Sequence, residues 1–273
     1  MIDRVRSCIG DNCGATRRKW FCSLSSPFHF RSALFCRCMS SQSKFVRSVL
    51  ALRGPQMASI VQAEEATLSQ LWTSSEYRAL PLKGRYIKLV EVVDAKIAAT
   101  ERQRFEAADA PRSECSAGCS SCCRSQHILL SHLEAQVLVS VIHQLPAEQR
   151  ALVLSQIAAA EPTGDAKGTA CAVLREDLCS AYEGRPMMCR TYLSTSVQRC
   201  LEFAAGSSKP PQVLGYPGFV GIAALSAANT DKQPRYEINT LLARMFGDVG
   251  LLEAWLSGNP SVIWDLAVKE TRW

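Results

Sequence analysis

The side chains best suited to chemistry are the thiols of eight cysteines between positions 115 and 200. They are Cys115, Cys119, Cys122, Cys123, Cys171, Cys179, Cys189 and Cys200. The first four fall within nine residues, and the last two of these are adjacent. Thiols separated by two or three residues gather soft ligands around one metal centre. The pattern therefore predicts a metal site, and it specifies no reaction.

The spacing of the first four cysteines suits convergence on one side. On a helix, all four side chains would point within an arc of about 100°. Gly118 indicates instead that the first turn is a loop and that a helix starts near Cys119, where its N-terminus would favour thiolates. Adjacent side chains cannot point in the same direction. We therefore expect either Cys122 or Cys123 to serve a second centre or to pack.

The second set of cysteines begins in a predicted hairpin over residues 171–182, with a turn at 175–177. A three-residue turn places Cys171 and Cys179 on the same face, whereas a two-residue turn places them on opposite faces. Cys189, on a following helix, and Cys200, further along the chain, would complete the set of ligands around the metal. Eight thiols fit two four-coordinate sites, or one cluster with additional redox cysteines.

The ordered pattern resembles the YkgJ-type cysteine-cluster family over about residues 112–200. It reads Cys-x3-Cys-x2-Cys-Cys, then Cys-x7-Cys-x2-Tyr-Glu-x-Arg-Pro-x2-Cys-Arg. That family is described as a zinc- or iron-chelating domain, and its members are often labelled iron–sulfur proteins. The resemblance implies chelation by the first seven cysteines, whereas Cys200 matches the core pattern less closely. Ala181 stands where the family usually has a bulky residue.

Two cofactors compete for these ligands. An iron–sulfur cluster is favoured because every candidate ligand is a thiolate. The alternative is zinc in a closed shell of four thiolates, which stabilises a fold without doing chemistry. We predict that Arg185 and Arg190 neutralise the anionic centre, with ordinary helix solvation as the alternative. We expect Tyr182 to pack against the centre. Three histidines are weaker ligand candidates: His127, His132 and His143.

Several enzyme classes lack support. The Cys-x3-Cys-x2-Cys spacing also occurs in radical S-adenosylmethionine enzymes, which usually carry an aromatic residue where this chain has Ser121. Repeated strand–helix units are also missing, so we exclude that class. The sequence contains no Ser-His-Asp order, phosphate loop or dinucleotide motif. Whether the protein is an enzyme stays open.

Charge separates the N-terminus from the rest of the chain. Residues 1–56 carry ten Lys and Arg against two Asp and Glu, and residues 57–273 carry 21 against 23. The mildly acidic body argues against a nucleic-acid partner. The Arg- and Ser-rich leader is typical of an organelle transit peptide. We favour an upstream extension of the coding region, with translation starting at Met57 or Met39, and we exclude this segment from the fold.

The same composition predicts location. The leader has no apolar core of a secretory signal, and no apolar run reaches the 18 or so residues of a membrane span. We expect a cytoplasmic protein, or one of an organelle matrix if the leader is a transit peptide. A reducing compartment keeps thiols free of structural disulfides, which strengthens the metal interpretation.

Apolar periodicity predicts helices at 58–73, from Pro81 onward, after the capping box Ser131–Glu134, at 147–160 and in the C-terminal third. The predicted fold is mainly α with a small β-hairpin, compact around the Cys-ligated metal centre. We divide it into the leader (1–56), N-terminal helices (57–111), a cysteine-cluster domain (112–204) and a helical segment packed on it (205–273).

The predicted function is iron–sulfur or zinc binding in redox or electron-transfer support of an unidentified partner protein. The first alternative is a zinc-stabilised interaction module without catalysis. The second is a protein-modifying enzyme related to flagellar lysine methylases. Those methylases carry a similar cysteine cluster, but the methyl-donor motif is missing from this sequence.

Overall fold

The computed structural model describes residue 47 and residues 54–106, 111–125, 128–160, 170–228 and 234–268. All of them belong to one compact unit that spans Gln42–Trp273. The predicted leader lies outside the described residues except for residues 47 and 54–56. Among the helices of the described ranges, none combines the length and the apolar character that crossing a membrane requires.

Three helices form the N-terminal part of the described fold: α3 (Pro55–Thr73), α4 (Ser75–Arg78) and α5 (Leu82–Glu106). Proline at the start of α3 is favourable because its missing amide hydrogen needs no partner there. Ser74 caps α4 by accepting a hydrogen bond from the Tyr77 amide. Apolar residues that recur every three or four positions predict one buried face of α5, formed by Leu82, Tyr86, Leu89, Val93 and Ile97. The last four are buried, as predicted, whereas Leu82 is 39% exposed.

The middle of the chain holds α6 (Ser121–Ser125), β1 (Leu129–Ser131), α7 (His132–His143) and α8 (Ala147–Ala159). The capping box is confirmed, because Ser131 Oγ accepts from the Glu134 amide and Glu134 Oε2 accepts from the Ser131 amide. Strand β1 pairs antiparallel with β4 (Arg235–Glu237), with Leu130 opposite Tyr236. This two-stranded sheet joins segments about a hundred residues apart in the sequence, and it was not predicted.

The predicted hairpin exists, but its turn is shorter than expected. Strands β2 (Leu174–Arg175) and β3 (Leu178–Cys179) pair with Arg175 opposite Leu178. Only Glu176 and Asp177 lie between them, with φ angles of 48° and 62°. Positive φ at both central residues is the mark of a type I′ turn, which matches the right-handed twist of a hairpin. The predicted three-residue turn was therefore wrong.

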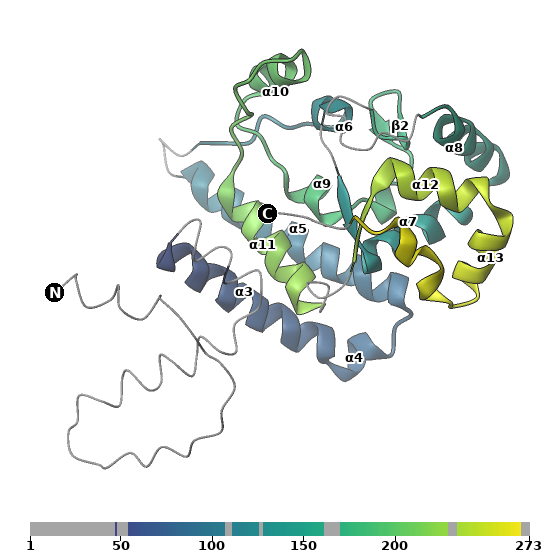
Figure 1. The fold of residues 1–273 in the computed structure, drawn as a ribbon. Helices are drawn as coiled ribbons and strands as arrows, with labels where there is room; N and C mark the ends of the chain where they lie inside the picture. The colour runs from purple at the N-terminus through teal and green to yellow at the C-terminus, as the bar shows by residue number, and fades with distance from the viewer. Residues whose placement is uncertain are drawn as a thin grey trace, which may run out of the picture. The chain divides into compact units, whose positions relative to one another are not determined.

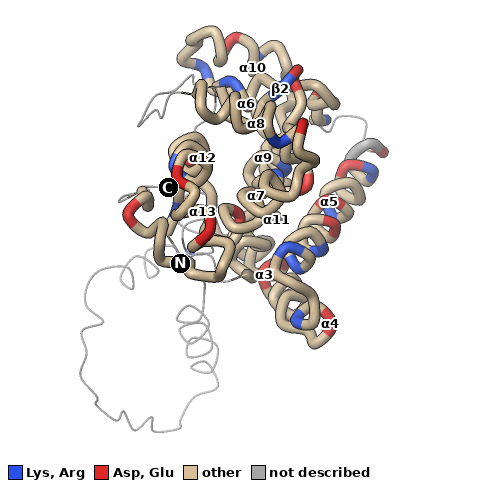
Figure 2. Tube along the Cα trace, turned by 90° about the vertical axis from the view of Figure 1, so that its right-hand side faces the viewer, with Lys and Arg blue, Asp and Glu red and all other residues tan. Residues whose placement is uncertain are grey.

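Short helices follow the hairpin: the 3-10 helix η2 (Tyr182–Gly184), α9 (Met187–Thr191) and α10 (Val197–Ala204). The C-terminal part comprises α11 (Gly215–Ala227), α12 (Ile238–Gly247), α13 (Val249–Leu256) and the 3-10 helix η4 (Pro260–Leu266). Helix α11 packs against α3, α5 and α9. In both views of the fold, α6, α10 and β2 lie at the same end of this unit (Figures 1 and 2).

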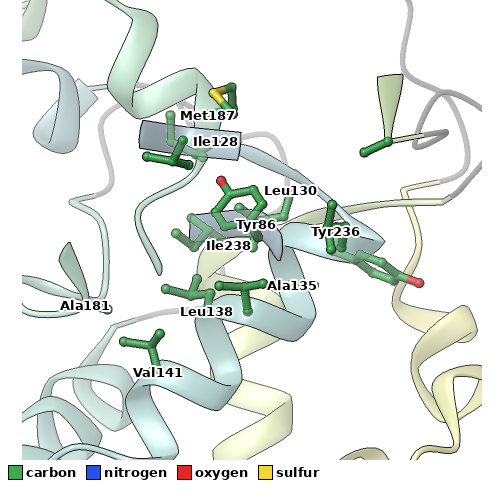
Figure 3. Close-up of a cluster of buried hydrophobic side chains, with 14 of the residues drawn as sticks. Tyr86, Ile128, Leu130, Ala135, Leu138, Val141, Ala181, Met187, Tyr236 and Ile238 are labelled. Atoms are coloured by element: carbon green, nitrogen blue, oxygen red, sulfur yellow. The ribbon is translucent and has the colours of Figure 1, made fainter. Parts of the chain in front are cut away.

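The buried core draws on helices from the N-terminal, middle and C-terminal parts of the described fold, among them α3, α5, α7, α11 and α12. Figure 3 shows Leu138 and Val141 of α7 in one buried cluster with Tyr86 of α5 and Ile238 of α12. Tyr236 on β4 is also fully buried. Lys, Arg, Asp and Glu are interspersed along the surface of α5, outside this core (Figure 2). The structure is mainly α with two small antiparallel sheets, as the predicted fold class requires.

Candidate metal centre

The first cysteine cluster spans a loop, which carries Cys115 and Cys119, and the short helix α6 after it, which carries Cys122 and Cys123. Gly118 has φ of 82°, a left-handed conformation that confirms the predicted loop. Helix α6 begins at Ser121, two residues after Cys119. The Glu114 amide donates a hydrogen bond to the Ser194 carbonyl at 2.9 Å, so the loop runs against the chain between α9 and α10.

The two cysteine segments are joined directly by the backbone. The Cys171 amide donates to the Cys123 carbonyl oxygen at 2.7 Å. Asn239 of α12 holds the same segment, because its Oδ1 accepts from the Ala172 amide at 2.8 Å and its Nδ2 donates to the Ala170 carbonyl at 3.0 Å. Segments about 50 residues apart in sequence are thereby held side by side.

The charges of five thiols act on one another, and those of all but Cys171 act on Arg185. We call these five the Arg185 group: Cys122, Cys123, Cys171, Cys179 and Cys189. Burial raises the pKa of Cys189 well above its ordinary value, and the charges of neighbouring thiolates raise it further. Burial lowers the pKa of Arg185, but the thiolate charges, led by Cys189, outweigh that effect and raise it overall. The guanidinium is thus placed to balance negative charge on this group.

Cys171 and Cys179 interact even though the turn of the hairpin has two residues. We expected such a turn to separate them, because side chains alternate along strands. Cys171 lies before β2, and its carbonyl accepts from the Leu174 amide at 2.9 Å, so a turn interrupts the alternation. Burial, with the charge of Cys179 as a lesser cause, raises the pKa of Cys171 to about 12.

Backbone amides donate hydrogen bonds to both of these sulfur atoms. Burial raises the pKa of Cys171 and of Cys179, and bonds from the backbone of Val173 and Ala181 respectively work against that increase. Such bonds favour the thiolate, which is the form that binds metals.

The adjacent pair in α6 is unequal. A hydrogen bond to Cys123 raises the pKa of the Cys122 thiol, and burial adds to the increase. The same bond lowers the pKa of Cys123. Cys122 is therefore the donor, and Cys123 is the thiol of the pair that ionises more readily.

The remaining three cysteines lie around Ser194, and we call them the Ser194 group: Cys115, Cys119 and Cys200. Cys115 Sγ accepts a hydrogen bond from the Ser194 amide at 3.2 Å. Burial raises the pKa of Cys200, against a hydrogen bond from Ser194 and together with the charges of Cys115 and Cys119. Cys119 lines a pocket of about 510 Å³ between its own loop and α10, so this group lies beside a surface opening.

Arg190 holds the segment between the hairpin and α9. Its side chain is only 7% exposed, and Nη1 lies 3.4 Å from Oδ2 of Asp94 on α5. Nη2 donates to the Tyr182 carbonyl at 2.7 Å, and Nε donates to the Arg185 carbonyl at 3.0 Å. Tyr182 is 61% exposed, and its ring lies under both guanidinium groups. Arg190 therefore shapes the site chiefly through backbone oxygens.

Two of the three histidine candidates, His132 and His143, lie apart from these contacts. His127 lies outside the described residues. His132 is buried in the core, where its Nδ1 is 3.0 Å from the Tyr236 hydroxyl, and burial lowers its pKa. His143 ends α7. Ser194 and Asn239 also position cysteine segments, although they lie far from those segments in the sequence. They were not predicted, because neither residue belongs to a recognisable sequence motif.

The chemistry of the donors fits a thiophilic metal, since the described cysteines are free thiols with backbone donors and a balancing cation. Across the described ranges, however, no three His, Cys, Asp or Glu side chains are already arranged to hold an ion. A metal would therefore bind only if these side chains changed their positions.

Comparison with known proteins supports the same chemistry. Residues 114–207, about a third of the chain, match the family model CxxCxxCC, described as a "putative zinc- or iron-chelating domain". The predicted resemblance is confirmed. The match includes all eight cysteines and supports metal binding in general. No curated protein and no solved structure matches the chain.

The position of α9, which carries Cys189, depends on a glycine contact. A methyl group on Gly221 of α11 would lie 2.8 Å from Cγ2 of Thr191 on α9. We expect Gly221→Ala to lower the free energy of unfolding by about 1–3 kcal/mol, because the helices must move apart. Gly218→Ala in the same helix is the control, since a methyl group there meets no described atom within 4 Å. The control should raise stability by up to about 1 kcal/mol through helix propensity. Equal effects in urea denaturation would contradict this account.

Proposed function

We propose that residues 114–207 bind iron, as an iron–sulfur cluster, through the eight clustered cysteines and support electron transfer to a partner protein. The observation that carries the proposal is the assembly of five thiols around Arg185, from two segments about 50 residues apart. All the donors are sulfur, which is the ligand type that iron–sulfur clusters require.

The surrounding residues suit a charged, redox-active group. A cluster supplies a one-electron couple, and its potential depends on net charge and on hydrogen bonds to sulfur. Here the Arg185 guanidinium would offset thiolate charge, and the backbone donors to Cys171 and Cys179 would stabilise the anionic form. Arg190 and Asp94 would hold the loop that carries Arg185 in place.

Zinc is the second candidate, and the packing of the site favours it. Hydrogen bonds from Asn239 and the packing of α9 on α11 attach the thiol-bearing segments to the core. A zinc ion bound by thiols from these segments would link them to one another and so stabilise the fold. In that case the function would be protein interaction, and no electron would be transferred.

The test is the metal and acid-labile sulfide content of full-length protein purified without oxygen, together with its visible spectrum. Iron with matching sulfide and a band that bleaches on reduction would support the redox proposal. Stoichiometric zinc in a colourless protein would replace it with the structural one. Protein that folds without either metal, and takes up none when supplied, would overturn both.

A further inference from the structure

The two cysteine segments are joined at the surface as well as in the core. The inner connections are the bond from the Cys171 amide to the Cys123 carbonyl and the two hydrogen bonds of Asn239. The outer connection is the side chain of Asp177, which extends from the tip of the hairpin to the start of α6. Because side chains alone form this outer contact, a single substitution can remove it without altering the backbone bonds.

One carboxylate oxygen of Asp177 accepts two hydrogen bonds. Ser120 Oγ donates to Oδ1, and Arg124 Nη2 donates to the same atom at 2.7 Å. Arg124 Nε also donates to Ser120 Oγ at 3.1 Å. The three side chains thus form a closed set of hydrogen bonds, which we call the Asp177 latch. Hydrogen bonds to a charged group are stronger than those between neutral groups.

The latch connects residues that flank thiols in both segments. Ser120 and Arg124 lie on either side of the two cysteines of α6, and Asp177 lies two residues before Cys179. If the tip of the hairpin moved away from α6, it would carry Cys179 with it. The latch opposes that movement.

The turn itself does not require a carboxylate at this position. Glycine is the usual second central residue of a type I′ turn, and Asp177 occupies that place with φ of 62°. The other central residue, Glu176, has a side chain that is 79% exposed and pairs with its neighbour Arg175 at 3.3 Å. The two acids of one turn therefore differ, because only the Asp177 contact links the two cysteine segments.

We propose that Asp177 is a positioning residue for metal binding, because it holds the hairpin and Cys179 against the helix that carries Cys122 and Cys123. This role rests on the proposed function, since it concerns the same thiols. The side chains of Asp177 and Arg124 are about half exposed, at 52% and 53%. An ion pair in such a position adds little to global stability, so its loss acts mainly on the local placement of the two segments.

The decisive comparison is Asp177→Asn against Glu176→Gln, the same carboxylate-to-amide change at adjacent positions of one turn. Full-length proteins are titrated with Co²⁺ and followed by the thiolate-to-cobalt absorption. Asp177→Asn should bind Co²⁺ about threefold to tenfold more weakly, as expected for charged hydrogen bonds at a half-exposed site. Glu176→Gln should bind like the wild type. Without metal, both variants should unfold at the same urea concentration as the wild type, which separates positioning from loss of the fold.

Hydrogen exchange of the metal-free proteins gives a readout that does not depend on metal. The Cys171 amide is bonded across the two segments, so its exchange rate reports their separation. This amide should exchange several times faster in Asp177→Asn and at the wild-type rate in Glu176→Gln.

A double variant tests whether the side chains act as one unit. Asp177→Asn combined with Arg124→Gln should bind Co²⁺ no more weakly than the weaker of the two single variants, because both changes break the same latch. Additive losses would overturn the assignment, as would unchanged Co²⁺ binding by Asp177→Asn or an equal loss in Glu176→Gln. In those cases the wild type still binds metal and the proposed function survives. A wild type that binds no Co²⁺, zinc or iron would remove the proposed function and this role together.

Discussion

Replacing Cys189 with serine is expected to remove metal from the protein and to lower its thermal stability. Cys189 lies on α9 among the thiols of the Arg185 group, and α9 packs against α11 of the core. Metal binding contributes directly to folding when the ligands come from separate segments. A ligand present at a thousand times its dissociation constant stabilises a fold by about 4 kcal/mol, and a loss of that order is expected.

The neighbouring residue gives the control for this prediction. Met188 lies next to Cys189 on α9 and is partly exposed. Met188→Ser introduces the same side chain without removing a thiol, so its metal content should equal that of the wild type. Metal analysis and thermal melts followed by circular dichroism measure both effects. Unchanged metal content and melting in Cys189→Ser would remove this residue from the ligand set.

A second large effect is expected at Glu134, which does more than cap its own helix. Its side chain is 1% exposed. Oε2 accepts from both the amide and the hydroxyl of Ser131, and Oε1 accepts from the Met187 amide at 2.8 Å. Met187 is the first residue of α9, so one carboxylate joins the starts of α7 and α9. Glu134→Ala leaves these buried donors without acceptors, and each unsatisfied buried group costs about 1–3 kcal/mol.

We therefore expect Glu134→Ala to lower the free energy of unfolding by about 3 kcal/mol in urea denaturation. We also expect it to weaken metal binding by Cys189, because the start of α9 loses its bond to α7. Glu148→Ala is the control, because Glu148 is exposed in the first turn of α8. The control should change stability by less than about 0.5 kcal/mol. If Glu134→Ala melted like the wild type, the link between α7 and α9 would contribute little.

Local patterns in the sequence identified much of this molecule. The capping box at Ser131, the apolar face of α5 and the left-handed loop at Gly118 all follow from interactions within a few residues, so they could be predicted. The cysteine spacing likewise predicted the chelating domain that the family comparison supports. Even the hairpin was located correctly, although its two-residue turn required the backbone angles of Glu176 and Asp177.

Tertiary structure alone decided how these parts come together. The division of the thiols between Arg185 and Ser194 depends on contacts such as the Cys171–Cys123 backbone bond. The β1–β4 pairing and the bond from Met187 to Glu134 also join distant segments. A sequence pattern records which residues share a helix or a turn. It does not record which segments, separated by 50 or more residues, supply hydrogen-bond partners to one another, because that depends on how the whole core packs.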